Sequence, residues 1–139
     1  MRMYGKELAL DCTPESARIS RELVRSTLHS IDTDLVEVAA ILTDEMVANA
    51  VKHGQPPISL AIESDREGIV ISVADSGPEF PEARTVSRTA ENGRGLMIID
   101  ILSDEWGVLP LYQGKQVWFR LHVRDVLAGQ TNRNPRSED

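Results

Sequence analysis

The chain has 139 residues, of which 41% are hydrophobic and 27% charged, so it is long enough for one globular domain with a buried core. Its single cysteine, Cys12, excludes an intramolecular disulfide, and no apolar run is long enough for a membrane span or a signal peptide. The formal net charge of −7 argues against direct nucleic-acid binding, which depends on clustered Lys and Arg. We therefore expect a cytoplasmic protein that contacts neither nucleic acid nor membrane.

The first elements are a strand and two helices. Residues 6–11 alternate in character and predict an edge strand. Thr13 and Pro14 then predict a helix start, with Thr13 as the cap and Pro14 at the first helical position, where no backbone donor is required. This helix should end near Ser30, and a second should begin at Asp32 or the residue after it.

The second helix carries a row of polar residues. Glu45, Asn49 and His53 recur every four residues, which places them on roughly one helix face. An apolar stripe runs beside them, so the row indicates a lined pocket next to the core; the stripe consists of Leu35, Val38, Ala39, Leu42, Met46 and Ala50. The alternative is the ordinary edge of an amphipathic helix, with His53 and Gly54 as its C-terminal cap.

Two strands and a long loop follow. Residues 58–64 and 68–74 predict a hairpin, joined by the polar residues 65–67. Residues 76–92 are rich in Gly, Pro, Ser, Thr and charges, and they predict a long mobile loop with a functional role, because long loops inside compact domains usually have one.

The last part of the chain predicts one more helix and one more hairpin. Residues 96–102 are almost entirely apolar and predict a buried helix, whereas 105–111 and 115–123 predict the hairpin, with its turn at Gln113 and Gly114. The polar tail, residues 126–139, is expected to be disordered. The elements together predict a single domain over residues 1–125 with an α+β fold: a two-layer sandwich of a mixed, largely antiparallel sheet with helices on one face.

Two further motifs carry chemistry. Asp75 ends an apolar strand and begins the sequence DSGPEF, although a carboxylate is costly to bury there without a partner. A simple Asx turn with Gly77 is the alternative explanation. The pair Gly93 and Gly95 precedes the last helix, where glycines let backbone N–H groups approach a phosphate closely.

In this order, the polar helix, the strand-ending aspartate and the glycine pair resemble the N box and the two glycine boxes of the GHKL (histidine kinase-like) ATPase superfamily. Over residues 13–123 the chain is most similar to its small anti-sigma factor serine/threonine kinases. The resemblance implies that Glu45 is the catalytic base, that Asn49 coordinates Mg²⁺ and that Asp75 accepts a hydrogen bond from adenine. The other ATP-binding residues that it implies are His53, Gly77, Gly93, Arg94, Gly95 and Leu96. For His53, a capping or packing role is the stronger alternative.

The resemblance also implies a function. Such proteins use ATP and Mg²⁺ to phosphorylate a serine of an anti-anti-sigma antagonist of the STAS type, bind a sigma factor, and are commonly homodimers. Glu45 lies one helical turn before Asn49 and can take the proton of the attacking hydroxyl, a role that contributes roughly 10²–10⁴-fold. The sequence therefore predicts an anti-sigma factor with protein serine kinase activity.

Two departures from the family pattern favour another function. Glu79 stands where the first glycine box usually has a second glycine, and Gln116 stands where threonine is frequent, close to the adenine-binding aspartate. Both bear on nucleotide affinity, so the alternative is a GHKL-like module that sequesters a protein partner without phosphoryl transfer. A detached histidine-kinase ATPase domain ranks last, because no helix pair with a phosphoacceptor histidine precedes Thr13.

Overall fold

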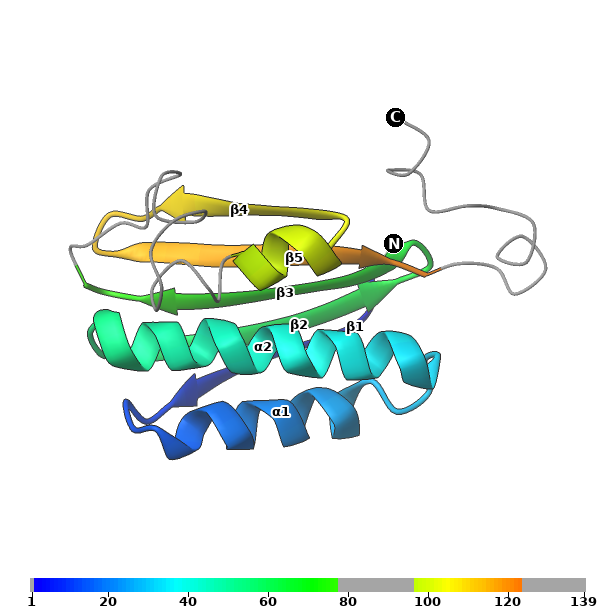
Figure 1. Ribbon diagram of the computed structural model, residues 1–139, viewed down its shortest axis with the longest axis horizontal. Coiled ribbons are helices and arrows are strands. Elements are labelled where there is room, and N and C mark those ends of the chain that lie inside the picture. Colours follow the sequence, from blue (N-terminus) through cyan, green and yellow to red (C-terminus); the bar gives the residue numbers. More distant parts are fainter. Residues whose placement is uncertain (1, 78–96, 124–139) are drawn as a thin grey trace.

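The structure is a computed structural model that describes residues 2–77 and 97–123 (Figure 1). Its regular elements, in chain order, are β1 (Arg2–Leu10), α1 (Glu15–Thr27), α2 (Thr33–His53), β2 (Ile58–Asp65), β3 (Gly68–Asp75), β4 (Glu105–Pro110) and β5 (Lys115–His122). A further short helix spans residues 97–102. Most of the predicted loop at 76–92 and all of the predicted tail at 126–139 lie outside the described residues.

The five strands form one sheet in the order β1-β2-β3-β5-β4, and every described pairing is antiparallel. Figure 1 shows α1, α2 and the short helix on the same face of this sheet. The α+β two-layer prediction is thus confirmed, and so are both hairpins and the edge position of the first strand. Within the described ranges, no helix combines the length and apolar character that crossing a membrane requires.

The core lies between α2 and the inner face of the sheet. Alternate residues along the strands are buried, because successive strand side chains point to opposite faces. The sheet contributes Ile58, Leu60, Ile62, Ile69, Ile71, Val73, Phe119 and Leu121, and α2 contributes Val36, Ala39, Ala40, Leu42, Met46, Val47 and Ala50. The helix that carries the polar row is therefore fixed along its whole length.

The start of α2 agrees with the sequence, and that of α1 does not. Asp32 caps α2, since its Oδ1 accepts from the backbone N–H groups of Asp34 at 2.8 Å and Leu35 at 3.2 Å. Helix α1 begins at Glu15, and no side chain caps it. Thr13 contributes its carbonyl oxygen instead, which accepts from the N–H of Ser16, so a backbone turn replaces the predicted cap.

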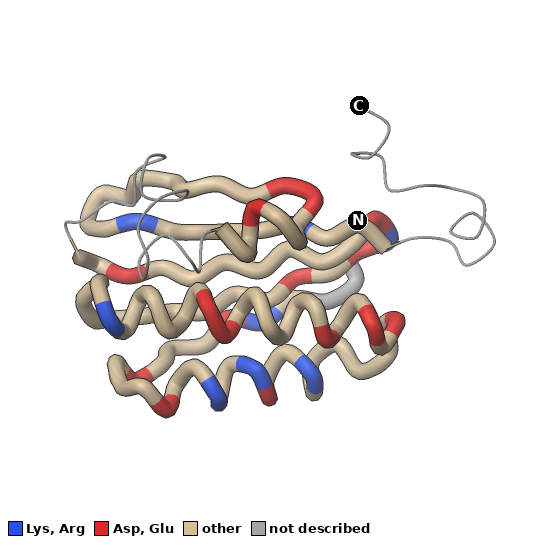
Figure 2. The backbone as a smooth tube through the Cα atoms, viewed as in Figure 1, with Lys and Arg blue, Asp and Glu red and all other residues tan. Residues whose placement is uncertain are grey.

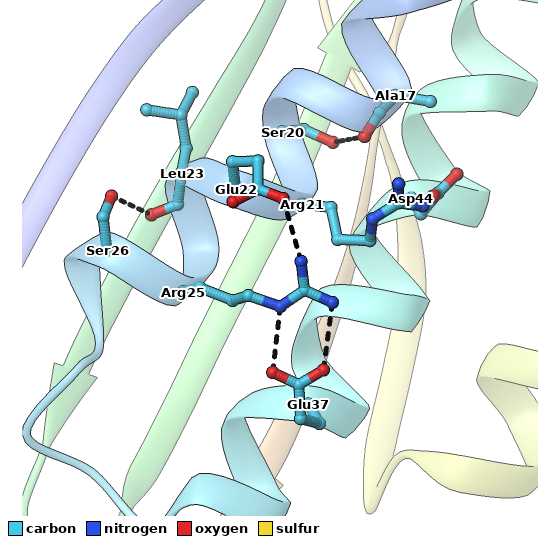
Figure 3. A network of polar contacts seen from close by, with 9 residues as sticks. All are labelled: Ala17, Ser20, Arg21, Glu22, Leu23, Arg25, Ser26, Glu37 and Asp44. Atoms are coloured by element: carbon cyan, nitrogen blue, oxygen red, sulfur yellow. Dashed lines mark hydrogen bonds and ion pairs between the residues drawn. The ribbon is translucent and has the colours of Figure 1, made fainter.

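Ion pairs join α1 to α2 on their solvent side (Figure 3). The guanidinium of Arg25 donates to Glu37 of α2 at 2.9 and 3.0 Å and, within α1, to Glu22 at 3.0 Å, and Arg21 pairs with Asp44 of α2. The hydrogen bond from Arg25 holds the pKa of Glu37 below its usual value. Figure 2 shows basic and acidic positions alternating along α1, whereas α2 is acidic along most of its length and has one lysine near its end, so the arginines of α1 lie beside an acidic helix.

The short helix at residues 97–102 corrects one prediction, because most of it is exposed. Ile101 is 58% exposed, Leu102 43% and Met97 39%, whereas Ile99 is fully buried. A helix lying on one side of a two-layer fold buries only one stripe of its surface, so an apolar run of this length cannot be buried all round. The run was predictable as a helix but not as a buried one.

Candidate functional site

The polar row of α2 lies beside the core, as predicted. Glu45, Asn49 and His53 are all half-buried, and their neighbours Met46, Val47 and Ala50 are buried. Among the described residues, no group of three or more His, Cys, Asp and Glu side chains could hold a metal ion. The assignment of Mg²⁺ to Asn49, whose amide oxygen suits this hard cation, stays a prediction.

Asp75 is the most enclosed charged group of the site, with 5% of its surface exposed. Its Oδ1 accepts from the backbone N–H of Gly77 at 2.7 Å and lies 3.4 Å from the backbone nitrogen of Gln55. The Nζ of Lys115 lies 3.1 Å from Oδ1 and 3.0 Å from Oδ2. The contact with Gly77 is the Asx-type turn that was the alternative reading, so the turn and an enclosed carboxylate coexist here.

Three glycines from separate segments surround Asp75. A Cβ on Gly54, at the end of α2, would lie 2.4 Å from the carboxyl carbon of Asp75. A Cβ on Gly77 would lie 3.0 Å from Oδ1, and one on Gly114, whose φ is +102°, would lie 1.9 Å from the backbone oxygen of Asp75. These backbones thus approach the aspartate more closely than any side chain would allow. The sequence indicated Gly77 as a site residue, but it marked Gly54 and Gly114 only as helix-ending and turn residues.

Lys115 is the site residue that sequence reasoning missed. In the register of β3 and β5, Asp75 pairs with Lys115 and Ala74 with Gln116, so Lys115 and Gln116 point to opposite faces of the sheet. The side chain of Gln116 donates to Ser72 Oγ at 3.3 Å, on the face without helices. Gln116 therefore does not present its side chain to Asp75, contrary to expectation. Strand register was the signal that could have found Lys115.

His53 lies at the same end of α2, next to Gly54. Its Nε2 is buried and has no hydrogen-bond partner among the described residues. Leaving such an atom unpaired costs about 1–3 kcal/mol, so a water molecule or a ligand atom is expected to supply the missing hydrogen bond. The binding role of His53 stays a prediction.

The loop after α2 completes this end of the site. The backbone N–H of Ser76 donates to the carbonyl oxygen of Gln55 at 2.9 Å, and its hydroxyl donates to the carbonyl of Pro56. The end of β3 is thus tied to the chain that leaves α2. Chemically, this arrangement offers the carboxylate of Asp75 to a hydrogen-bond donor at a place shielded from water. The predicted phosphate-binding residues, Gly93, Arg94, Gly95 and Leu96, and the departure at Glu79 lie outside the described residues.

Solved structures with a similar fold include domains of two bacterial proteins. The RsbU and RsbW domains of Rv1364c from Mycobacterium tuberculosis match 88% of this chain and 34% of that chain, with a TM-score of 0.67 and 21% identity. The histidine kinase domain of the blue-light activated histidine kinase EL346 from Erythrobacter litoralis matches 79% of this chain and 60% of that chain, with a TM-score of 0.51 and 15% identity. At these identities the likeness shows the fold.

Sequence comparison identifies the family. The sensor protein CseC of Streptomyces avermitilis is 34% identical over 80 residues, which cover 58% of this chain and 15% of that protein. The chain thus corresponds to a small part of that relative and to about a third of the Rv1364c chain. Residues 10–121 match the histidine kinase-like ATPase domain, and this match covers most of the sequence. On this match over residues 10–121, the chain belongs to the histidine kinase-like ATPase family.

Proposed function

We propose that this protein is a cytoplasmic anti-sigma factor with ATP-dependent protein serine kinase activity, which binds a sigma factor and phosphorylates a STAS-type anti-anti-sigma protein. The observation that carries the proposal is the carboxylate of Asp75, buried among three glycine backbones at the end of the helix that bears Glu45 and Asn49. The fold shared with a chain that contains an RsbW domain supports it, and the sequence resemblance adds a homodimer to the proposal.

Each residue has a role in this proposal. Asp75 accepts a hydrogen bond from the amino group of adenine, and Asn49 offers its amide oxygen to Mg²⁺. ATP supplies the phosphoryl group, and Mg²⁺ offsets the charge of its phosphates. His53, Gly77 and the glycine box at residues 93–96 bind the nucleotide. The buried orphan nitrogen of His53 and the close approach of glycine to Asp75 fit a bound nucleotide.

Glu45 handles the proton of the reaction. It precedes Asn49 by one helical turn, about 6 Å along the axis, which puts its carboxylate near the metal end of the site. There it can take the proton from the serine hydroxyl of the target protein as that oxygen bonds to the γ-phosphorus of ATP and ADP leaves with the bridging oxygen. A base of this kind contributes roughly 10²–10⁴-fold to the rate.

The test separates binding from chemistry. Affinity for ATP with Mg²⁺ is measured by calorimetry, and phosphoryl transfer is measured with radiolabelled ATP and the purified STAS-domain proteins of the same genome. We expect Asp75→Asn and Asn49→Ala to lose ATP affinity, and Glu45→Gln to keep affinity but to lose transfer by roughly 10²-fold or more. An unchanged transfer rate in Glu45→Gln would remove Glu45 from the role of base.

A second candidate function is a binding module that sequesters a protein partner without phosphoryl transfer. The ion pair of Lys115 with both oxygens of Asp75 favours it, because a buried carboxylate that already has a charged partner does not by itself require a nucleotide. The same calorimetry decides between the two: a wild-type protein that binds a sigma factor but no ATP is the module.

A further inference from the structure

We propose that Lys115 is a second base-reading group, whose ammonium donates to ring nitrogen N1 of adenine while Asp75 accepts from the neighbouring amino group. The inference rests on the proposed function, since it requires ATP at this site, and it adds a residue that determines base selectivity. The ion pair between these two side chains is then part of the ligand-binding surface rather than a purely structural contact.

The burial of Lys115 calls for an explanation. Its side chain is 9% exposed and that of Asp75 is 3% exposed, although lysine is among the residues least often buried. Removing two charges from water carries a desolvation cost that one ion pair does not always offset, and an apolar pair of similar volume is often at least as stable. Stabilisation of the fold therefore does not account well for a buried ion pair at the predicted base-binding end of the site. Recognition of the base accounts for it better.

The hydrogen bonds already present leave one donor and one acceptor side by side. Oδ1 of Asp75 accepts from Gly77, from Lys115 and, at 3.4 Å, from the backbone N–H of Gln55, whereas Oδ2 has Lys115 as its only partner among the described residues. Each oxygen of an ionised carboxylate accepts about two hydrogen bonds, so Oδ2 has one place left. The ammonium has three donor hydrogens, of which Asp75 engages two. Any group that reaches Oδ2 thus meets an ammonium 3.0 Å from that oxygen.

Adenine matches this pair of groups. Its amino group is a donor and the adjacent N1 is an acceptor, so the amino group faces Oδ2 while N1 faces Nζ of Lys115. Guanine and hypoxanthine reverse both groups on the same edge, with O6 as acceptor and N1–H as donor. In the pose that keeps the sugar in place, they would set O6 against the carboxylate and N1–H against the ammonium. Sites with buried polar groups reject ligands that leave those groups unpaired.

The test removes the acceptor N1 from the nucleotide and, separately, the donor ammonium of Lys115 from the protein. Affinities of ATP and 1-deaza-ATP, both with Mg²⁺, are measured by calorimetry for the wild type and for Lys115→Met. We expect the wild type to bind 1-deaza-ATP roughly 10- to 100-fold more weakly than ATP, the range for one hydrogen bond from a charged donor. In Lys115→Met the two affinities should agree within about twofold, because the donor is gone.

The controls keep the outcome interpretable. 7-Deaza-ATP changes a ring nitrogen on another edge and should bind the wild type as ATP does. Equal affinities of ATP and 1-deaza-ATP for the wild type overturn the inference even where Lys115→Met fails to fold, and so does an equal loss in both proteins. No ATP binding by the wild type at all overturns the proposed function as well, so the two failures are distinguishable.

Discussion

At the scale of single residues, the position of Asp75 depends on three neighbouring glycines, which have no Cβ atom. Gly54, Gly77 and Gly114 come from three segments, and a Cβ on any of them would press on the aspartate or on its backbone. Only the turn residue Gly114 has a left-handed φ, so Gly54 and Gly77 are required for space rather than for backbone conformation. These glycines fix where the carboxylate stands.

Gly54→Ala tests this requirement. The new Cβ would lie 2.4 Å from the carboxyl carbon of Asp75, so the carboxylate must move. We expect ATP affinity to fall about tenfold or more and the free energy of unfolding to fall by about 1–3 kcal/mol. Calorimetry and urea unfolding measure the two effects. Gln55→Ala, which removes only an exposed side chain from the next position, is the matched control; equal effects of the two variants would contradict the steric argument.

Asp65 gives a prediction about pH. Its Oδ1 accepts from the backbone N–H groups of Glu67 at 2.8 Å and Gly68 at 3.0 Å in the β2–β3 turn, and these bonds lower the pKa of Asp65 from its usual 3.8. A lowered pKa in the folded state means that the charged form stabilises the fold. This stabilisation is complete well above pH 3.8 and is lost as the pH falls through the folded-state pKa.

We therefore expect Asp65→Asn to be less stable than the wild type at pH 7, with a difference that disappears as the pH is lowered toward 2. Urea unfolding at a series of pH values measures it. Glu67→Gln, at an exposed position of the same turn, serves as the control. A difference that stays constant across this range would show that the charge of Asp65 has no part in stabilising the turn.

At the scale of elements, α2 joins the core to the site. Leu42 is fully buried on this helix, whereas its neighbour Ile41 is 47% exposed. We expect Leu42→Ala to lower the free energy of unfolding by roughly 2–5 kcal/mol, and Ile41→Ala to change it by no more than about 0.5 kcal/mol. Chemical denaturation of both variants checks this, and similar losses would mean that α2 is packed differently from the description above.

The sequence predicted the elements better than it predicted their surroundings. Helical spacing was enough for α2, because periodicity reports directly on which side faces the core. Period alone could not tell how much of the helix at 97–102 is buried, since burial depends on the layer that covers it. The contact between Asp75 and Lys115 was also beyond the sequence, because it depends on the register of two strands that lie forty positions apart at this pair.

At the scale of the whole molecule, the site is a junction. The end of α2, the end of β3 and the start of β5 meet at Asp75, although the chain between them is long. A ligand that bridges these segments binds only the folded state, so it should stabilise the entire domain.

Thermal and urea unfolding with ATP and Mg²⁺ test this coupling. At a ligand concentration 100 times the dissociation constant, we expect a gain of about 2.7 kcal/mol in the free energy of unfolding. GTP at the same concentration should give a much smaller gain, and Asp75→Asn should lose most of the ATP effect. Equal stabilisation by both nucleotides would indicate binding through the phosphates without recognition of the base.

Because α2 continues without interruption to Gly54, it fixes how far Asn49 and Glu45 lie from Asp75 along the helix axis and in which direction they point around it. An α-helix rises about 1.5 Å and turns about 100° per residue, so Asn49 stands about 7.5 Å, and Glu45 about 13.5 Å, along the axis from the glycine that touches Asp75. One residue inserted between Asn49 and Gly54 would swing Asn49 and Glu45 by about 100° relative to Asp75. An insertion of one or two residues in this part of α2 should therefore disrupt the site. Insertions that leave the site intact should fall in the turns between strands.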